Sequence, residues 1–286
     1  MFVNLATDDA FKRVSLAPLA SVDREAFVTP LTCERVYFSG NRGICLTMPD
    51  DGVAADSAPR FWADVFDERF DRLHRFTLTG LPSRVRVSAD GRRAAATMFD
   101  SGHSYALHGF STITTIFDLH RGTTIGDLED FTVIRDRVPF KAVDFNFWGV
   151  TFARDGDTFY ATLATGGHHY LIKGSVDARR AEVIHDGVEC PSLSPDDRRI
   201  AFKRRVGSES RGWWQIVVLD LSTMDARPVW NERRSVDDQV DWLDERQILY
   251  SITGGDNGAD VWVVNVDSED PARLLRHAGH SPATVR

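Results

Sequence analysis

Apolar and polar positions alternate along most of the chain in short runs, a pattern typical of β-strands that bury one face. A recurring unit joins two such runs: an apolar strand, a tight turn that carries Asp or Asn, and a second apolar strand. Asp and Gly suit these turns because both tolerate positive φ. The copies cover residues 38–46, 87–96, 152–160, 193–202 and 242–250.

A second pattern follows each of these hairpins. It consists of a β-rich stretch that ends near Asp, then a polar turn and another short strand, such as residues 227–230 or 272–275. Four strands over about 40–60 residues are the unit of a β-propeller blade. A generic β-sandwich is the alternative, but the ordered alternation of two turn types favours the propeller. The copies cover residues 63–67, 115–119, 173–177, 217–223 and 261–267.

The pattern therefore predicts an all-β, six-bladed β-propeller that occupies the whole chain as a single domain. Residues 1–31 contain three strands and lack an innermost one, whereas residues 281–286 resemble the start of a blade. We expect residues 281–286 to pair beside residues 2–7 and close the ring without free edges. The expected blades are 1–31 with 279–286, then about 32–80, 81–141, 142–187, 188–234 and 235–278.

Composition narrows the class of protein. The 286 residues are 42% hydrophobic and 27% charged, which is ordinary for a globular domain. The formal net charge of -8 disfavours non-specific binding to nucleic acid or to anionic membranes, because both need cationic patches. No run approaches about 20 apolar residues, so we expect no membrane span. We expect a monomer with no nucleic-acid partner.

The first residues and the three cysteines bear on the cellular compartment. Residues 1–9 lack a basic segment followed by an apolar one, so we expect a cytoplasmic protein. A leader outside this chain is the alternative, and it would make the protein extracytoplasmic. Cys33, Cys45 and Cys190 lack the spacing of a zinc knuckle. We expect three buried thiols, with a Cys33–Cys45 disulfide as the alternative in an exported chain.

Four segments carry a resemblance to a known family. Residues 194–202 resemble the WD40-like PD40 repeat of TolB-type propellers, and residues 219–223 stand where that repeat has its second turn. Residues 144–153 and 235–244 resemble actinobacterial proteins labelled TolB-like. The resemblance covers nearly the whole chain and implies the six-bladed fold. Because these motifs specify turns and packing, it implies no particular reaction.

Motifs of several enzyme classes are missing from the sequence. It contains no nucleophile elbow G-x-S-x-G, which argues against a propeller-capped serine peptidase. It also contains no P-loop, no G-x-G-x-x-G and no H-E-x-x-H. His168 and His169 are adjacent, so on a strand their rings face opposite ways and do not favour a metal site. The sequence identifies no catalytic residue, metal or cofactor.

Alignment of the blades by their first turns places candidate ligand-binding residues at the mouth of the central channel. Loops before the inner strands and after the second strands share one face, so side chains distant in sequence converge there. We expect the carboxylates to raise one another's pKa, and His280 to stay charged to higher pH. Solvated loops and inter-blade salt bridges are the alternative role for these residues. The candidate ligand-binding residues are Arg84, His103, Trp148, Glu189, Asp238 and His280.

Aromatic residues and turn carboxylates have competing interpretations. The aromatic loop at residues 144–148 either stacks a sugar or base or packs between blades, and packing is favoured. Trp213 and Trp214 have the same ambiguity, and an exposed Trp there would mark a partner surface. The Asp residues of the first turns recur in one register, so we expect them to serve structure rather than catalysis. These residues are Asp90, Asp155, Asp196 and Asp244.

Two hypotheses about function follow. The first is a non-enzymatic propeller that binds a protein partner or a small ligand on its loop-rich face. The second is a propeller enzyme, a hydrolase or lyase that acts on a small polar or sugar-like substrate at the channel mouth. The enzyme would use Glu189, Asp238 and His280 with His103. A Ca²⁺ ion held by the carboxylates would be a variant of this second hypothesis.

Overall fold

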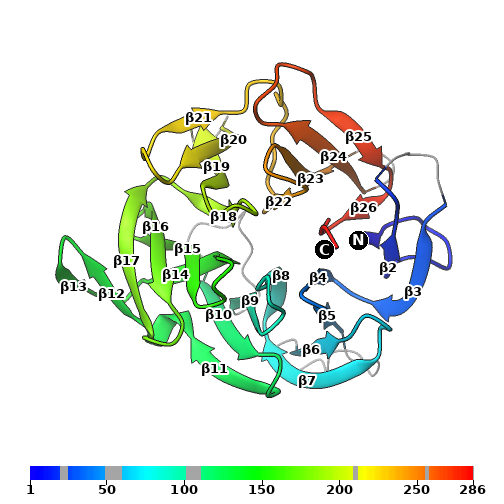
Figure 1. Ribbon diagram of the computed structural model, residues 1–286, viewed down its shortest axis with the longest axis horizontal. Helices are drawn as coiled ribbons and strands as arrows, with labels where there is room; N and C mark the ends of the chain where they lie inside the picture. Colours follow the sequence, from blue (N-terminus) through cyan, green and yellow to red (C-terminus); the bar gives the residue numbers. More distant parts are fainter. Residues whose placement is uncertain (20–24, 49–59, 101–110, 209–211, 255–257, 286) are drawn as a thin grey trace.

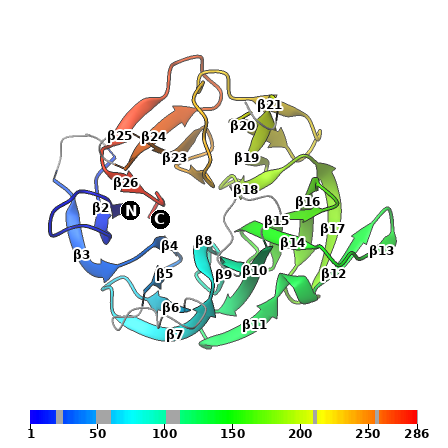
Figure 2. The same ribbon diagram turned by 180° about the vertical axis from the view of Figure 1, so that it is seen from behind.

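The computed structural model describes residues 1–19, 25–48, 60–100, 111–208, 212–254 and 258–285. Its strands form six sheets arranged radially around a central channel, as Figures 1 and 2 show from opposite sides. The predicted all-β, six-bladed propeller is confirmed. In the described part of the chain no helix is long and apolar enough to cross a membrane.

Each blade runs from an inner strand at the channel to an outer strand at the rim (Figure 1). The first blade contains β26 (Gly279–His280), β1 (Phe2–Asn4), β2 (Arg13–Leu16) and β3 (Phe27–Thr32). The second contains β4 (Arg35–Ser39), β5 (Arg42–Thr47), β6 (Arg60–Phe66) and β7 (Arg72–Thr79). The third contains β8 (Leu81–Val87), β9 (Arg93–Asp100), β10 (Ser111–Asp118) and β11 (Thr123–Asp127).

The fifth and sixth blades follow the same four-stranded plan. The fifth contains β18 (Glu189–Leu193), β19 (Arg199–Val206), β20 (Trp213–Asp220) and β21 (Ala226–Pro228). The sixth contains β22 (Asp241–Trp242), β23 (Gln247–Thr253), β24 (Ala259–Asn265) and β25 (Arg273–Arg276).

The fourth blade has six strands because a hairpin is added to its outer edge. Its regular strands are β14 (Asn146–Phe152), β15 (Thr158–Thr165), β16 (His168–Ser175) and β17 (Arg180–Asp186). After the 3₁₀ turn η1 (Leu128–Asp130), β12 (Thr132–Arg135) pairs in parallel with β17, and β13 (Val138–Phe140) pairs with β12.

This hairpin departs from the sequence prediction, which placed residues up to 141 in the third blade. A strand pattern specifies that a hairpin forms but not which sheet edge receives it, and here the edge of β17 receives it. The hairpin projects at the rim of the ring (Figure 1). Its outermost strand contains Pro139, whose missing N–H opposes pairing with a further strand.

Hydrogen bonds within the first turns hold the Asp residues that recur there. Asp196 Oδ1 accepts from Ser194 Oγ at 2.6 Å and from Arg198 N at 3.2 Å. Backbone donors of the turns are thereby satisfied, which is the structural role expected from the sequence. The other first-turn carboxylates also accept the N–H of the residue two positions later; they are Asp90, Asp155 and Asp244.

We expect Asp196→Ala to lower the free energy of unfolding by about 0.5–2 kcal/mol, as removal of a capping side chain does. The reason is that the N–H of Arg198 and the hydroxyl of Ser194 lose their shared acceptor. Asp196→Asn keeps an acceptor oxygen and should cost less. Denaturant unfolding of the three proteins measures the difference. Unchanged stability of Asp196→Ala would contradict the structural role.

Hydrophobic side chains gather mainly in the seams between neighbouring blades. In one seam Phe61 and Val65 of β6 cluster with Val87 of β8, and in another Ile216 of β20 clusters with Trp242 of β22. Clusters of this kind join blade one to two and each following blade to the next as far as blade six.

The seam between blade six and blade one is different. Among the described residues, none of these clusters crosses it. An apolar cavity of about 480 Å³ lies there instead. Its walls include Phe2, Leu16, Leu249, Val261 and Leu275.

The two ends of the chain close the ring, as predicted. β26 pairs with β1 through Val3 and His280 and through Asn4 and Gly279. Further along, Ala283 and Met1 exchange hydrogen bonds of 2.9 Å in both directions. The strand that pairs with β1 therefore consists of residues 279 and 280, which precede the predicted residues 281–286. It ends there because Ser281 has a φ of 51°, outside the range of extended backbone.

Cys33 and Cys45 form a disulfide, and Cys190 is a buried free thiol. The expectation of three thiols was therefore wrong. Cys33 lies just before β4 and Cys45 lies in β5, and the hairpin brings their Cα atoms to 5.5 Å, within the range that a disulfide needs. The separation of the two residues along the sequence does not reveal that their Cα atoms lie this close together.

Replacement of both cysteines, Cys33→Ser with Cys45→Ser, should lower the free energy of unfolding by about 3 kcal/mol. The link spans a sequence separation of 12 residues, and its loss enlarges the unfolded ensemble. Thiol titration of the denatured, unreduced parent should find one reactive thiol, that of Cys190, and three after reduction. Three thiols before reduction would show that the disulfide does not form.

Candidate functional site

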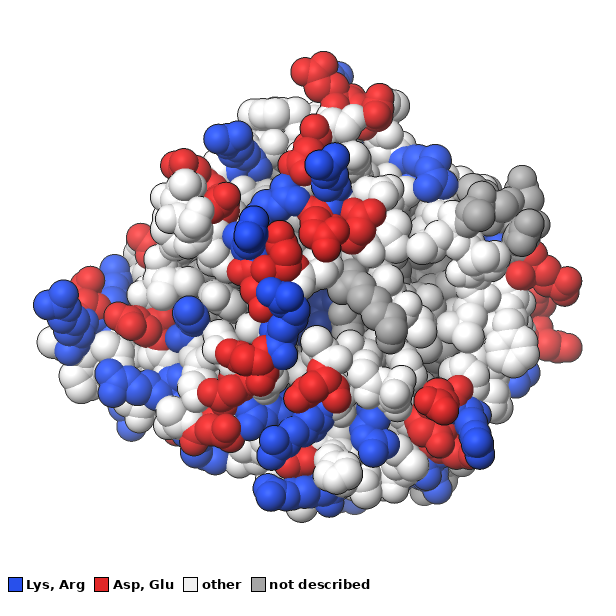
Figure 3. Space-filling view, in the orientation of Figure 1, with Lys and Arg blue, Asp and Glu red and all other residues white. Residues whose placement is uncertain are grey.

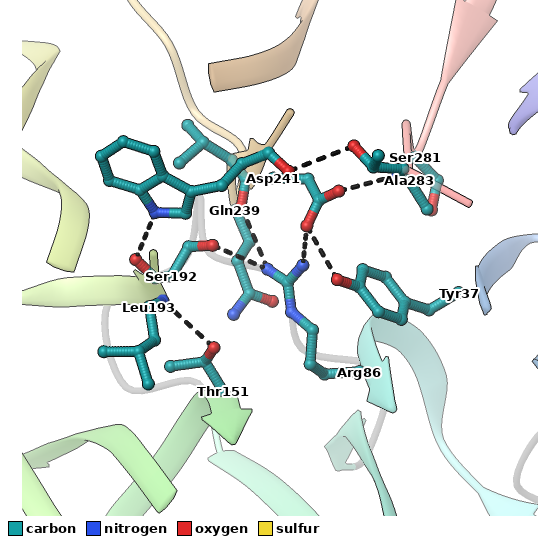
Figure 4. Close-up of polar contacts among 12 residues, drawn as sticks. Tyr37, Arg86, Thr151, Ser192, Leu193, Gln239, Asp241, Ser281 and Ala283 are labelled. Atoms are coloured by element: carbon teal, nitrogen blue, oxygen red, sulfur yellow. Dashed lines mark hydrogen bonds and ion pairs between the residues drawn. The ribbon is translucent and has the colours of Figure 1, made fainter. Parts of the chain in front are cut away.

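A buried polar network, the channel hub, fills the middle of the ring. It consists of Tyr37, Arg86, Ser192, Gln239 and Asp241. Figure 4 shows the Arg86 guanidinium and the Tyr37 hydroxyl converging on the Asp241 carboxylate, with the guanidinium next to the Tyr37 ring. Arg86 Nη1 lies 2.7 Å from Asp241 Oδ1, and Tyr37 Oη donates to the same oxygen at 2.8 Å. Arg86 and Asp241 are both buried, so each charge depends on the other.

The hub connects the inner strands of blades two to six with the segment that follows β26 of blade one. Gln239 Nε2 donates to Val150 O of β14 at 3.2 Å and to Pro191 O of β18 at 2.8 Å. Thr284, beyond β26, donates its N–H to Asp241 Oδ2 at 2.8 Å. A space of only about 20 Å³ remains beside these side chains. Among the described residues, the side chains of the hub thus occupy the channel behind the mouth.

A polar cavity of about 480 Å³ opens at the mouth, where the inner strands begin and the second strands end. Blades six, one and two all contribute to it. We call it the mouth cavity. Its walls are formed by Leu5, Arg35, Ser235, Asp237, Asp238, Ser251, Thr253, Gly258, Ala259 and His280.

Asp238 is a buried carboxylate that several donors hold in place. Ser251 donates to Oδ2 through both its hydroxyl and its N–H, and Gln239 donates its N–H to Oδ1 at 2.9 Å. Arg84 Nη2 lies 3.9 Å from Oδ1. Burial acts to raise the pKa of Asp238, but Arg84, Arg35 and the Ser251 hydrogen bonds outweigh it, so the pKa lies below its usual value. The expected rise was wrong because these cations and donors dominate.

His280 lines the same cavity, with Nδ1 3.0 Å from Arg35 Nη1. Burial, together with the positive charge of Arg35, lowers the pKa of His280 to about 3. The expectation that His280 stays charged to higher pH was therefore wrong, because Arg35, Lys12 and Arg84 outweigh the single carboxylate of Asp238. The imidazole is neutral near pH 7. Since a guanidinium only donates, Nδ1 accepts and Nε2 carries the hydrogen.

A second group of polar residues, the Lys203 cluster, lies beside the mouth cavity: Lys203, Asp237, Glu189, His169 and Trp148. The Lys203 side chain is 1% exposed and forms an ion pair with Asp237. Glu189 stands opposite Lys203 in the pairing of β18 with β19, and its Oε1 lies 3.1 Å from His169 Nδ1. Burial raises the pKa of Glu189 to about 7.

Trp148 belongs to the packing of the ring rather than to an open mouth. Its side chain is fully buried and meets the His169 ring edge-on, with ring centroids 5.6 Å apart. Phe147 is also buried, which agrees with the packing interpretation of this aromatic loop. Trp213 and Trp214 are half-buried, and the Trp214 ring lies 4.2 Å from Lys203 Nζ.

The structure thus divides the six predicted ligand-binding residues. It brings Arg84, Asp238 and His280 together at the mouth, whereas Glu189 and Trp148 belong to the Lys203 cluster. His103 lies outside the described residues.

Sequence reasoning did not select three residues that complete the two groups: Lys203, Asp237 and His169. Lys203 is the cross-strand partner of Glu189. The register set by the first turn of this blade could therefore have identified Lys203 from the sequence. Within the described residues, no group of three or more His, Cys, Asp or Glu side chains is arranged to hold a metal ion.

The surface carries charges of both signs. Figure 3 shows one face of the ring, on which Lys and Arg are interspersed with Asp and Glu. On the face shown, neither the basic nor the acidic side chains gather into a large patch of one charge.

Comparisons with known proteins identify the fold. No protein-family model matches the sequence, and no curated protein is significantly similar to it. A solved structure from Agrobacterium tumefaciens described as TolB superposes with a TM-score of 0.55 at 13% identity, covering 91% of this chain and 87% of that one. An acylaminoacyl peptidase from Pyrococcus horikoshii gives a TM-score of 0.51 at 11% identity, covering 88% of this chain and 40% of the peptidase. At these identities the similarity shows the six-bladed, TolB-like fold alone.

Proposed function

We propose that this propeller is a non-enzymatic binding module that takes up a small polar ligand in its mouth cavity. The observation that carries the proposal is the cavity itself, which has about 480 Å³ of space, walls drawn from three blades, and charged side chains on two of them. Volumes of this size are typical of small-molecule sites. The filled hub behind the cavity supports the proposal, because it gives the cavity a rigid floor.

The protonation states at the mouth favour binding over catalysis. Asp238 has a pKa below its usual value and His280 one of about 3, so neither titrates near neutral pH. A general acid or base works best with a pKa near the working pH. Side chains with fixed charge and fixed hydrogen bonds suit recognition.

A metabolite screen tests the proposal, with thermal shift as the first readout and calorimetry as the second. Thr253→Phe places a large side chain in the cavity from an exposed position. We expect it to weaken a captured ligand at least tenfold. Val138→Phe, at the exposed rim strand β13, is the control and should bind as the parent does. If the ligands bind the parent, Thr253→Phe and Val138→Phe with equal affinity, the binding site does not lie in the mouth cavity.

A second candidate function is an enzyme, a hydrolase or lyase of a small polar substrate. The observation that favours it is the Glu189–His169 pair, because burial raises the pKa of Glu189 to about 7 and a general acid–base group needs such a value. Turnover of a captured compound that Glu189→Gln abolishes would favour this function over simple binding.

The same pKa shift predicts a dependence of stability on pH. The folded protein holds a proton on Glu189 more tightly than the unfolded chain, because the pKa rises from 4.5 to about 7 on folding. The associated stability is present below about pH 4.5 and is lost as the pH rises through 7. Glu189→Gln should therefore lose less stability than the parent between pH 5 and 8, as denaturant unfolding across this range measures.

We further propose that the protein works as a monomer in an oxidising, extracytoplasmic compartment. The Cys33–Cys45 disulfide supports this location over the cytoplasm, where thiols are kept reduced. Pro139 on the projecting edge strand supports the monomer, because it opposes pairing between copies. Sedimentation of the oxidised protein tests the oligomeric state, and thiol labelling in intact cells tests the compartment.

A further inference from the structure

The mouth cavity has walls of opposite charge on different blades. Asp237 and Asp238 approach from the segment that leads into β22 of blade six, and Arg35 begins β4 of blade two. His280 of blade one lies between these walls, with Nδ1 against Arg35. An acidic side and a basic side therefore face one small space.

The acidic side offers a partly open carboxylate. Asp238 is buried and held by Ser251, whereas the Asp237 side chain is 48% exposed although Oδ1 pairs with Lys203. An ammonium group in the cavity would find at Asp237 a carboxylate that is already ordered. Such charge-assisted hydrogen bonds are the strong ones.

The basic side offers donors for an anionic group. The Arg35 guanidinium lines the cavity and carries a positive charge there, and its Nη1 contacts Nδ1 of His280. His280 is neutral, and its hydrogen is on Nε2, so it adds a donor without adding a charge. Planar guanidinium groups match carboxylates in geometry.

We infer that the mouth cavity recognises a small dipolar molecule that carries an ammonium group and a carboxylate, such as a free α-amino acid or a short peptide. The ammonium group binds at Asp237 and the carboxylate binds at Arg35 and His280. This inference rests on the proposed binding function and adds the chemical class of the ligand. The volume of about 480 Å³ exceeds what one small amino acid fills, so a di- or tripeptide fits the cavity better.

The probes are alanine, Ala-Ala and Ala-Ala-Ala, together with N-acetyl-Ala-Ala and Ala-Ala amide, which each lack one terminal charge. Calorimetry should find binding of at least one uncapped probe, with each cap weakening it about 10- to 100-fold, as loss of a charged hydrogen bond does. Comparison of alanine with the two peptides distinguishes a free amino acid from a peptide as the ligand.

Variants connect each end of the probe to one wall. Asp237→Asn should weaken Ala-Ala about tenfold or more and leave N-acetyl-Ala-Ala unchanged. Arg35→Gln should weaken Ala-Ala to the same degree and leave Ala-Ala amide unchanged. Asp136→Asn and Arg227→Gln make the same chemical changes at exposed positions in the rim hairpin and on the outer strand β21, and both variants should bind as the parent does.

The outcomes separate this inference from the proposed function. Capped and uncapped probes of equal affinity, or no binding of any uncapped probe, would overturn the dipolar ligand. If a sugar or another molecule without both charges then binds and Thr253→Phe blocks it, the binding function stands and only the ligand class is wrong. If no compound of the metabolite screen depends on Thr253, both proposals fail.

Discussion

Asp241→Ala is expected to lower the free energy of unfolding by about 3–5 kcal/mol, because it leaves the Arg86 guanidinium buried without its carboxylate. The loss also removes the acceptor of the Tyr37 hydroxyl and of the Thr284 N–H. Arg86 and Asp241 side chains are each 6% exposed, so water cannot replace the missing partner. Denaturant unfolding at neutral pH measures the change.

An exposed ion pair serves as the control, because it shows what the loss of an ion pair costs when its side chains are not buried. Arg154 and Asp197 form an ion pair in which the side chains are 64% and 28% exposed. Arg154→Met should therefore cost at most about 1 kcal/mol. The double replacement of Arg86→Met with Asp241→Leu should recover part of the loss, because it removes both buried charges. An Asp241→Ala variant as stable as Arg154→Met would contradict the central role of the hub.

Deletion of residues 281–286 should destabilise the ring by about 3–6 kcal/mol and cause aggregation. Hydrogen bonds of Ala283 with Met1, of Thr284 with Asp241 and Trp242, and of Ser281 with β4 all disappear, at about 0.5–1.5 kcal/mol each. The deletion leaves β26 beside β1 but removes Ala283, so the backbone groups of Met1 lose their partner and are open to other chains. Thermal unfolding and light scattering measure the two effects.

Two point variants sharpen this result. Ala283→Pro removes the N–H that bonds Met1 O and should reproduce part of the loss. Val285→Ser changes a residue that is 48% exposed in the same segment and should be nearly neutral. A truncated protein that melts like the parent would show that these six residues do not hold the ring closed.

Turn chemistry explains why so much of the fold was predictable. In a first turn the carboxylate that accepts hydrogen bonds, such as that of Asp196, lies within two or three residues of its donors. The residues that make the turn therefore appear together in the sequence. One correct turn fixes the register of its two strands, and repetition of the turn fixes the number of blades. By contrast, β12 pairs with β17, which lies far from it in the sequence, and no local sequence pattern indicates this pairing.

The convergence of two candidate residues on one cavity was predictable from the sequence, whereas their electrostatics was not. The alignment of blades placed Asp238 and His280 at one mouth, and both line the cavity there. Their pKa values depend on which cations of other blades approach and on how fully water is excluded, and these are properties of packing. For the same reason the burial of Trp148 and the disulfide of Cys33 with Cys45 required the three-dimensional structure.

The cavity between blades six and one has a consequence for motion. Among the described residues, hydrophobic clusters join five seams of the ring, whereas an apolar cavity of about 480 Å³ opens at this seam. Local opening begins where the fewest apolar contacts resist it. Amide hydrogens of β1 and β26 should therefore exchange with solvent faster than those of β14 and β18. We therefore expect the ring to open locally at its closing seam before it opens at the seams between the other blades.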